Sequence, residues 1–508
     1  MLVVEIVAAI NAAGTLQTLY LSDEGFCTSP TDTPANTFCD PRIIDPGSLG
    51  LHAFGDGRTS GTTRLESGDL VLVNTDGALD DWINYSFDGR SITIRSGEEG
   101  GAYPSSFTTV FKGTMESFET TFDKAVIKLR DKQFVFDLPL LTTLYTGSNV
   151  LPDGLEGTPD DIKDTQKPRV YGKVYNITPA FINTSKLTYQ VSDGPVQSIS
   201  AVYDKGAAFT AGADFATTTL LQAAVPAAGS YVTCLSAGMF RLGSKPAGTV
   251  TADVTQGATA ADRTVAQIVK AVALAASLSA GEISAADVTA LDTLNSSVVG
   301  VYVSDDSTFQ SVIDQLVNSV GAYASFDNTG TLRMGRLASP SGTPLLYLQE
   351  YDIRDNFERR SIKDGGIPVY RVSVNYSKIY TPQSSDLAGV VTEARRAAIA
   401  KEWSVSKVED IAIKTQWKLS DELKQDTLLT NATDAATEAA RLLALYKVRR
   451  DLYEVTISSS LFAQANLKIM DVVSVTSSRF GMSGGKLFKV LGYSFSLRSQ
   501  EVTLNLWA

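Results

Sequence analysis

Histidine is almost absent from this chain, and its scarcity limits the chemistry that the residues can support. Among 508 residues there is one histidine, His52, and there are three cysteines. A Ser-His-Asp triad, a Cys-His pair and a His-based metal site all require an imidazole. His52 lies between Leu51 and Ala53, and we interpret it as a structural histidine. Carboxylate chemistry is therefore the catalytic route that remains.

Two adjacent acids beside aromatic residues are the best local candidate for that route. Asp80 and Asp81 precede Trp82, and Tyr85 follows shortly after. A glycosidase needs only two carboxyl groups about 5 to 10 Å apart, and a neighbouring aromatic ring can stack on a sugar. With 56 acids in the chain, such a neighbourhood also arises by chance. A carboxylate-dependent glycan hydrolase and a monomeric carbohydrate-binding β protein stay open as alternatives.

Three other motifs match known sites only in part. Residues 481–485 fit the GxSxG pattern of hydrolases, but a strand follows and no histidine does, so we expect a hairpin turn. The glycines at positions 55, 57 and 61 have the spacing of a turn and precede no helix. The acidic run Asp153–Asp164 would place leucine, glycine and proline at the ligand positions of a calcium loop. We predict no catalytic, cofactor-binding or metal-binding residue.

The cysteines and the apolar segments indicate where the chain folds. Cys27, Cys39 and Cys234 form no CxxC pair, which favours reduced thiols, although a Cys27–Cys39 bridge stays open. Residues 2–7 are interrupted by a glutamate and follow no positive leader, so we expect a first strand and no signal peptide. Residues 215–240 are too polar for a membrane anchor. We expect folding in a cytoplasm.

The acidic surplus is confined to the first third of the chain. Residues 1–165 contain 25 Asp and Glu against 11 Lys and Arg, a balance of −14, and the other residues hold 31 acids against 33 bases, a balance of +2. An acidic surface repels phosphate backbones and anionic lipid. We therefore expect no direct binding of nucleic acid or membranes by this region.

Strands are expected through the first 250 residues. At roughly 100 to 200 residues per domain, the length predicts three or four domains. Short β-branched runs separated by Gly, Asp and Asn turns predict a meandering sheet or small barrel at the start. A linker rich in Gly, Pro and Asp follows at 151–167, and a second β-rich unit comes after it. The expected strands are Asp69–Val73, Ser91–Arg95, Phe107–Phe111, Ala125–Leu129, Arg169–Asn176, Leu187–Val191 and Ile199–Tyr203.

Helices are predicted only after residue 253. Apolar residues recur at helical spacing there, and serine N-caps precede some of the runs. The expected helices are 262–277, 284–294, 307–319, 387–403 and 433–449. The expected strands among and after them are 323–326, 332–335, 370–376, 453–458, 471–475, 487–493 and 501–507. The sequence thus predicts a β-rich, multidomain α+β fold with units 1–165, 166–250, 251–345 and 346–508.

Several of these segments resemble one family, the baseplate hub or tail-tip hub proteins of tailed bacteriophages. Residues 471–492 are similar to the strand, Arg-Phe-Gly turn and strand that end such proteins, and 502–507 to the strand that follows. The likeness covers nearly the whole chain and consists of turn and strand patterns. The other similar segments are Phe54–Arg58, Asp69–Asn74, Lys167–Val174, Tyr189–Gly194 and Ala201–Gly206.

The resemblance implies a homotrimeric structural protein of the virion tail tip, with no enzymatic activity and no cofactor. In it, tail-tube-like β-barrels at 1–165 and in 346–508 would flank mixed α+β middle domains and give a pseudo-sixfold ring. The implied partners are the distal tail protein ring, the C-terminus of the tape-measure protein, and a central fibre or spike protein. A separate chain would supply the tip, because this one ends after a strand. Genomic DNA would pass without specific binding, and an acidic barrel wall at 1–165 would let it slide.

Overall fold

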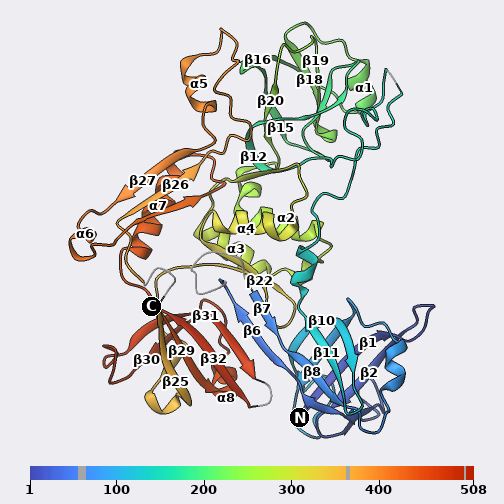
Figure 1. Ribbon diagram of the computed structural model, residues 1–508, viewed down its shortest axis with the longest axis vertical. Coiled ribbons are helices and arrows are strands. Elements are labelled where there is room, and N and C mark those ends of the chain that lie inside the picture. The colour runs from blue at the N-terminus through green and yellow to red at the C-terminus, as the bar shows by residue number, and fades with distance from the viewer. Residues whose placement is uncertain (55–63, 151, 362–365, 497–498) are drawn as a thin grey trace.

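Strands far outnumber helices in the computed structural model, which describes all residues except 55–63, 151, 362–365 and 497–498 (Figure 1). Two large sheets lie side by side at one end of the molecule, a helical layer lies in the middle, and a second β-rich region forms the other end. The β-rich α+β class expected from the sequence is confirmed. Within the described residues both large sheets have open strand orders, so no closed barrel ladder is observed.

The first large sheet is built by the N-terminal residues, and we call it the N-sheet. Its strand order is β3-β4-β2-β1-β9-β10-β11-β8-β5. Alternating residues such as Val4, Ile6, Ile92 and Ile94 face one buried core, because successive side chains of a strand point to opposite faces. The strands are β1 (Leu2–Ala9), β2 (Leu16–Ser22), β3 (Phe26–Cys27), β4 (Phe38–Pro41), β5 (Ile43–Asp45), β8 (Asp69–Val73), β9 (Ser91–Ser96), β10 (Thr108–Thr120) and β11 (Lys124–Arg130).

The far end of the molecule holds two five-stranded sheets that share a core of aromatic and β-branched residues. One sheet consists of β16 (Ala207–Ala208), β15 (Ser198–Asp204), β20 (Val250–Thr255), β12 (Arg169–Ile177) and β21 (Gly300–Val303). The other consists of β13 (Ala180–Asn183), β14 (Thr188–Gln190), β19 (Met239–Leu242), β18 (Ser230–Cys234) and β17 (Thr210–Asp214), with α1 (Thr218–Ala223) beside it.

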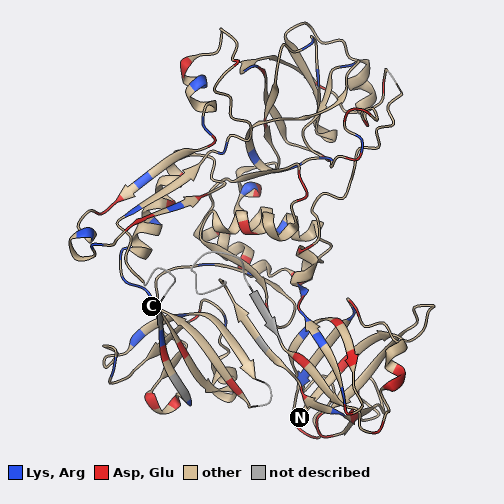
Figure 2. Cartoon of the chain, in the orientation of Figure 1, with Lys and Arg blue, Asp and Glu red and all other residues tan. Residues whose placement is uncertain are grey.

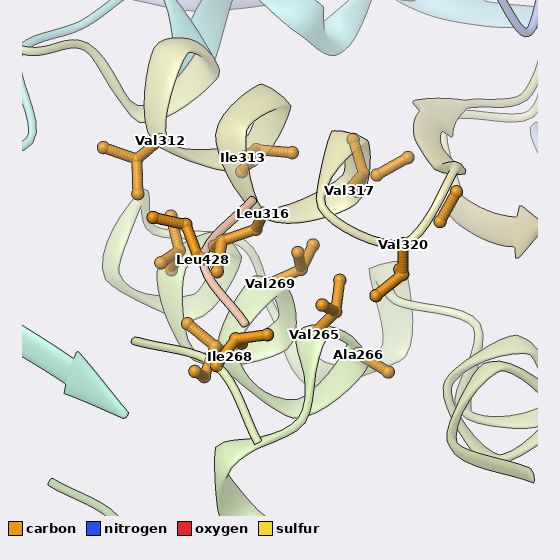
Figure 3. Packing of buried hydrophobic residues seen from close by; sticks show 14 of the residues in the cluster. Val265, Ala266, Ile268, Val269, Val312, Ile313, Leu316, Val317, Val320 and Leu428 are labelled. Atoms are coloured by element: carbon orange, nitrogen blue, oxygen red, sulfur yellow. The ribbon is translucent and has the colours of Figure 1, made fainter. Parts of the chain in front are cut away.

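The middle layer is helical and packs around one large apolar core. Its helices are α2 (Val265–Ala275), α3 (Ala285–Leu294) and α4 (Phe309–Asn318), and their N-caps are Thr264, Ser284 and Thr308. Figure 3 shows α2 and α4 meeting through Val265, Val269, Leu316 and Val317. The hairpin of β22 (Ala322–Phe326) and β23 (Leu332–Arg336) completes the layer.

The second large sheet is built by the C-terminal residues, and we call it the C-sheet. It contains β24 (Leu346–Leu348), β30 (Val472–Val475), β31 (Lys486–Ser496), β32 (Glu501–Trp507), β29 (Asp451–Ser458) and β25 (Asp355–Ser361), with α8 (Ser459–Ala465) after β29. A smaller sheet of β27 (Ser404–Glu409), β26 (Arg371–Tyr376) and β28 (Glu422–Asp426) packs on α7 (Ala432–Tyr446). Short helices α5 (Glu393–Ile399) and α6 (Ile413–Gln416) lie in its connections.

One predicted helix is much shorter than expected. The sequence predicted a helix over 387–403, but α5 covers only Glu393–Ile399. Its start is fixed by Thr392, whose side-chain oxygen accepts a hydrogen bond from the backbone amide of Arg395. The apolar residues before it, Leu387 and Val391, instead approach Gly206 of the far β-rich region. Their spacing therefore reflects docking of a loop and not a helical face.

Candidate functional site

A two-stranded ribbon joins the N-sheet to the C-sheet. Its outgoing strand is β5 followed by β6 (Ser48–His52), and its returning strand is β7 (Arg64–Ser67) followed by β8. The pairs β5·β8 and β6·β7 are both antiparallel. The base of this ribbon (43–45 and 69–73) therefore belongs to the N-sheet, and its outer half (48–52 and 64–67) belongs to the C-sheet.

Glycines allow the ribbon to change sheets. Gly47 has a φ of +86°, a conformation that residues with a Cβ rarely adopt. Opposite it, a Cβ added to Gly68 would lie 2.7 Å from the backbone nitrogen of Ser48. The amide of Gly68 donates to the Ser48 carbonyl at 2.6 Å, so the two strands stay paired through the bend. The bend thus requires these small residues.

The outer half of the ribbon completes the C-sheet. β6 pairs antiparallel with β31, with Leu51 opposite Tyr493 and His52 opposite Gly492. Ala53 and Phe54, which follow β6, are buried together with Trp507. Burial of such side chains contributes roughly 1.5–3 kcal/mol for each large one. The C-sheet therefore depends on residues from near position 50 of the chain.

His52 is held at this joint by its neighbours. The Nδ1 atom of His52 lies 3.2 Å from the side-chain nitrogen of Asn505 in β32. A Cβ added to Gly492 would lie 2.5 Å from the same Nδ1 atom, so the close approach of β6 requires glycine there. The structural role expected for His52 agrees with this position.

A cleft of about 950 Å³ lies between the two large sheets and the middle layer. Its walls are mixed, with apolar side chains from both sheets and polar side chains from the β22–β23 turn. The ion pair of Arg333 with Asp287, at 2.5 Å, lies beside it, and Asp327 is 3.7 Å from the same guanidinium. Burial raises the pKa of Tyr493 above its usual range. Arg333, Asp287 and Asp327 are thus close to opposite charges, and Tyr493 is neutral. Such groups are typical of a contact between packed elements and not of a catalytic site.

The paired carboxylates of the sequence lie on an exposed short helix beside a buried tryptophan. Asp80 and Asp81 open the short helix η2 (Asp80–Asn84), and both are exposed. The side chain of Asp80 accepts a hydrogen bond from Asn74 at 2.9 Å. Trp82 is only 8% exposed and packs against Phe87 and Phe118, so its face is not free to stack on a sugar ring.

The other sequence motifs have structural surroundings. Residues 481–485 lie in the connection of the antiparallel pair β30·β31, as expected for a hairpin, and Met482 among them is buried. The glycines at positions 55, 57 and 61 lie outside the described residues. Among the residues that the structure describes, no cluster of three His, Cys, Asp or Glu side chains could hold a metal ion. No described helix has both the length and the apolar composition needed to cross a membrane.

The cysteines are unbridged. In the β3·β4 ladder Phe26 lies opposite Cys39, and Cys27 lies opposite Phe38. Since opposite residues share a face and neighbours alternate, Cys27 and Cys39 point to different faces. Cys39 is buried, Cys27 is exposed, and burial raises the pKa of the Cys39 thiol to about 11.

Acidic residues are frequent in the N-sheet region, as the red segments of Figure 2 show, and some of them form internal ion pairs. The Arg42 guanidinium binds Asp76 through two nitrogens, at 2.9 and 2.8 Å, and Asp40 at 2.6 Å. This pairing holds the pKa of Asp76 below its usual range. The Glu5 carboxylate pairs with Arg95 at 3.0 Å and accepts a hydrogen bond from the Tyr103 hydroxyl. Most of the remaining acids stay on the surface.

Sequence reasoning missed the ribbon. The signal was present, because Pro46-Gly47 and Gly68 interrupt two runs that otherwise read as strands. Interruptions of this kind mark a bend, but they do not identify the distant strand that pairs with the outer half. That partner, β31, lies more than 400 residues later in the chain.

Comparisons with solved structures find tail and virion proteins. No family model matches the sequence, and no curated protein matches it. A tail protein from Neisseria meningitidis MC58 is 10% identical, with a TM-score of 0.44 over 100% of this chain and 96% of that one. A chain of the virion of a native gene transfer agent particle is 12% identical, with a TM-score of 0.44 over 68% and 85%. The 43 kDa tail protein of prophage MuSo2 from Shewanella oneidensis is 11% identical, with a TM-score of 0.38 over 99% and 98%.

Proposed function

We propose that this chain is a structural hub of a phage tail tip, a homotrimer that joins a sixfold tail tube to a threefold tip. The observation that carries the proposal is the pair of large sheets joined by the ribbon at one end of the molecule. Three copies would bring six such sheets around one axis, which is the number needed to match six subunits of a tube. The strand and turn segments of the sequence support the same assignment.

In this proposal the two large sheets act as tail-tube-like barrels that are completed in the assembly. The chain consists of four units, 1–165, 166–250, 251–345 and 346–508. The ribbon places the β6–β7 hairpin of the first unit in the sheet of the last unit. Open sheet edges are available for contacts in an assembly, since an unpaired strand edge is a template for another chain.

The proposed partners are the tail proteins that surround a channel for DNA. The distal tail protein ring would lie above, the tape-measure C-terminus would end inside, and a fibre or spike protein would attach below. The acidic surplus of residues 1–165 gives part of the wall a charge that repels DNA, which lets the genome pass without binding. The protein would fold in the host cytoplasm and reside at the tail tip of the virion.

An enzymatic role has little support from the candidate carboxylates. Trp82 is packed inside the N-sheet core and Asp80 is engaged with Asn74, so neither is arranged for glycan cleavage. We propose that the hub has no catalytic activity.

The mass of the purified chain separates these functions. A stable species at three times 54.3 kDa is the result expected for the hub. A monomer that clears a glycan substrate, and that loses this activity in Asp80→Asn or Asp81→Asn, would overturn the proposal in favour of a hydrolase.

A further inference from the structure

Two exposed patches of opposite charge lie on opposite sides of the paired large sheets. The first, which we call the acidic patch, is the outer side of η2 with Asp80, Asp81 and Ile83. The second, which we call the basic patch, consists of the exposed Arg479 and Phe480 in the connection between β30 and β31, and the partly exposed Lys486 at the start of β31. In Figure 1 the blue helix η2 lies at the right edge of the N-sheet, and β30 lies at the left side of the C-sheet.

The acidic patch carries an unusual apolar side chain among its charges. Ile83 is 66% exposed although it lies next to the buried Trp82. Asp81 is exposed and has no hydrogen-bond or ion-pair partner in the part of the chain that the structure describes. The nearby cation Arg42 is already engaged by Asp40 and Asp76. The acidic patch is therefore open to a partner that offers a cation next to an apolar surface.

The basic patch has the complementary composition. Phe480 is 48% exposed, and its φ of +55° is a conformation that bulky residues rarely adopt. Its ring packs on Phe357 at 5.8 Å, and the Arg479 guanidinium lies 5.4 Å from its centre. Lys486 lies 5.4 Å from the centres of the Tyr453 and Phe488 rings.

No described acid neutralises these two cations. Arg479 and Lys486 have no ion pair within the described residues. The nearby carboxylate Glu350 is occupied by Ser477 and Ser478, which donate to it at 2.6 to 2.9 Å. Partial burial of Lys486 lowers its pKa, and the opposing charge of Asp451 does not offset this effect. Asp451 is already paired with Arg359 and Arg449. An incoming acid would supply that missing partner.

We propose that the acidic patch of one copy binds the basic patch of a second copy. The contact is heterologous, because two different surfaces meet, and repeated head-to-tail contacts of this kind close into a ring when the rotation allows. Asp81 would pair with Arg479 or Lys486, and Ile83 would cover Phe480. This inference rests on the proposed hub, since it names the surfaces through which its copies meet.

Charge exchange at Asp81 and Arg479 tests the contact in the full chain. Both residues are exposed, so the single variants Asp81→Lys and Arg479→Glu are expected to keep the melting temperature of the wild type. Each should weaken association by about tenfold or more in sedimentation equilibrium, because like charges then face each other. The double variant should recover most of the loss. Glu99→Lys, an exposed reversal on another loop of the N-sheet, is the matched control and should change nothing.

The outcomes separate this contact from the proposed function. Recovery by the double variant supports the contact, and added salt should weaken it in the wild type. If the wild type forms a trimer and the single reversals leave it intact, this contact is wrong while the hub stands. A wild-type chain that remains monomeric at every concentration also overturns the proposed contact, because the contact then does not hold two copies together. The hub function is in that case tested separately, by the symmetry of the tail tip in the particle.

Discussion

The Nδ1 atom of His52 lies 3.2 Å from the side-chain nitrogen of Asn505, 453 positions later in the chain. One residue belongs to the ribbon that leaves the N-sheet, and the other belongs to the last strand of the C-sheet. The amide can donate to Nδ1 when that nitrogen carries no proton. Residues near position 50 and the last strand of the chain are thus parts of one sheet.

Replacement of Gly492 should loosen the ribbon. In Gly492→Ala the new Cβ would lie 2.5 Å from the His52 Nδ1 atom and 2.6 Å from the Leu51 carbonyl oxygen. Since backbone cannot easily move away, we expect a loss of roughly 1–3 kcal/mol in the free energy of unfolding, measured by urea denaturation. Gly484→Ala, where the added Cβ meets nothing within 4 Å, is the control and should be close to neutral. Equal stability of the two variants would contradict the role given to the ribbon joint.

Loss of Glu438 should destabilise the middle layer strongly. This carboxylate of α7 is 2% exposed and binds Arg336 of β23, and it binds Arg441 at 2.7 Å. Glu438→Ala leaves two guanidinium groups partly buried without their counter-ion, and we expect a cost of about 3–5 kcal/mol by chemical denaturation. Glu393→Ala removes an ion pair whose carboxylate is 96% exposed, so it should cost at most about 1 kcal/mol. A small effect at Glu438 would show that the triad contributes little.

Asp131 should make stability depend on pH. Burial raises its pKa from 3.8 to about 6, so the folded chain binds this proton more tightly than the unfolded chain. The contribution of Asp131 to stability is therefore greatest below about pH 4 and is lost as the pH rises towards about 6.

Asp131→Asn isolates that contribution. Its amide oxygen can still accept the hydrogen bond from the Gln133 backbone amide, which caps the helix η3 (Lys132–Phe136). The variant should melt at the wild-type temperature near pH 4 and above it near pH 8. The same comparison with Asp123→Asn, an exposed acid on the β10–β11 turn, should show no such divergence. A difference that is constant with pH would argue against a raised pKa.

Arg395 should hold the loop around α5 on the far β-rich region. Its guanidinium donates to the Asn176 side chain at 2.9 Å and lies 3.8 Å from the centre of the Tyr203 ring. Arg395→Ala removes both contacts, and we expect limited trypsin digestion to cut residues 377–403 several-fold faster. Lys401→Ala, a substitution at an exposed residue of the same segment, serves as the comparison. Unchanged protection in Arg395→Ala would mean that the apolar contacts of Leu387 and Val391 suffice.

The local pattern of the sequence predicted the long, strongly periodic elements but not the short ones or their distant partners. Helix α1 (Thr218–Ala223) lies before residue 253, so the prediction that helices occur only after that residue is wrong. The alternating run Asp69–Val73 is a strand as expected, and the Ser284 N-cap begins α3 where it was placed. The strands β27 and β28 were missed, because they are largely exposed and lack an apolar period. Their positions are set by pairing with β26 on the surface of α7, which is a tertiary effect.

For the candidate site, too, the sequence indicated residue types but not their surroundings in the fold. The residue types at Asp80, Asp81 and Trp82 suggested a sugar site, but only the packing of Trp82 reveals that its ring is unavailable. The apolar neighbours of His52 predict a structural histidine, and only the fold reveals its contacts with Gly492 and Asn505. Long-range strand pairing is fixed by core complementarity, which a single sequence does not display.

Electron microscopy of the parent particle tests the central claim most directly. If the chain is the hub, averaged images of the tail should show a threefold ring at the distal end of the tube. Its density should accommodate three copies of the 54.3 kDa chain, with their paired large sheets around the channel. A tail end without a threefold ring of this mass, or the chain located elsewhere in the particle, would contradict the account.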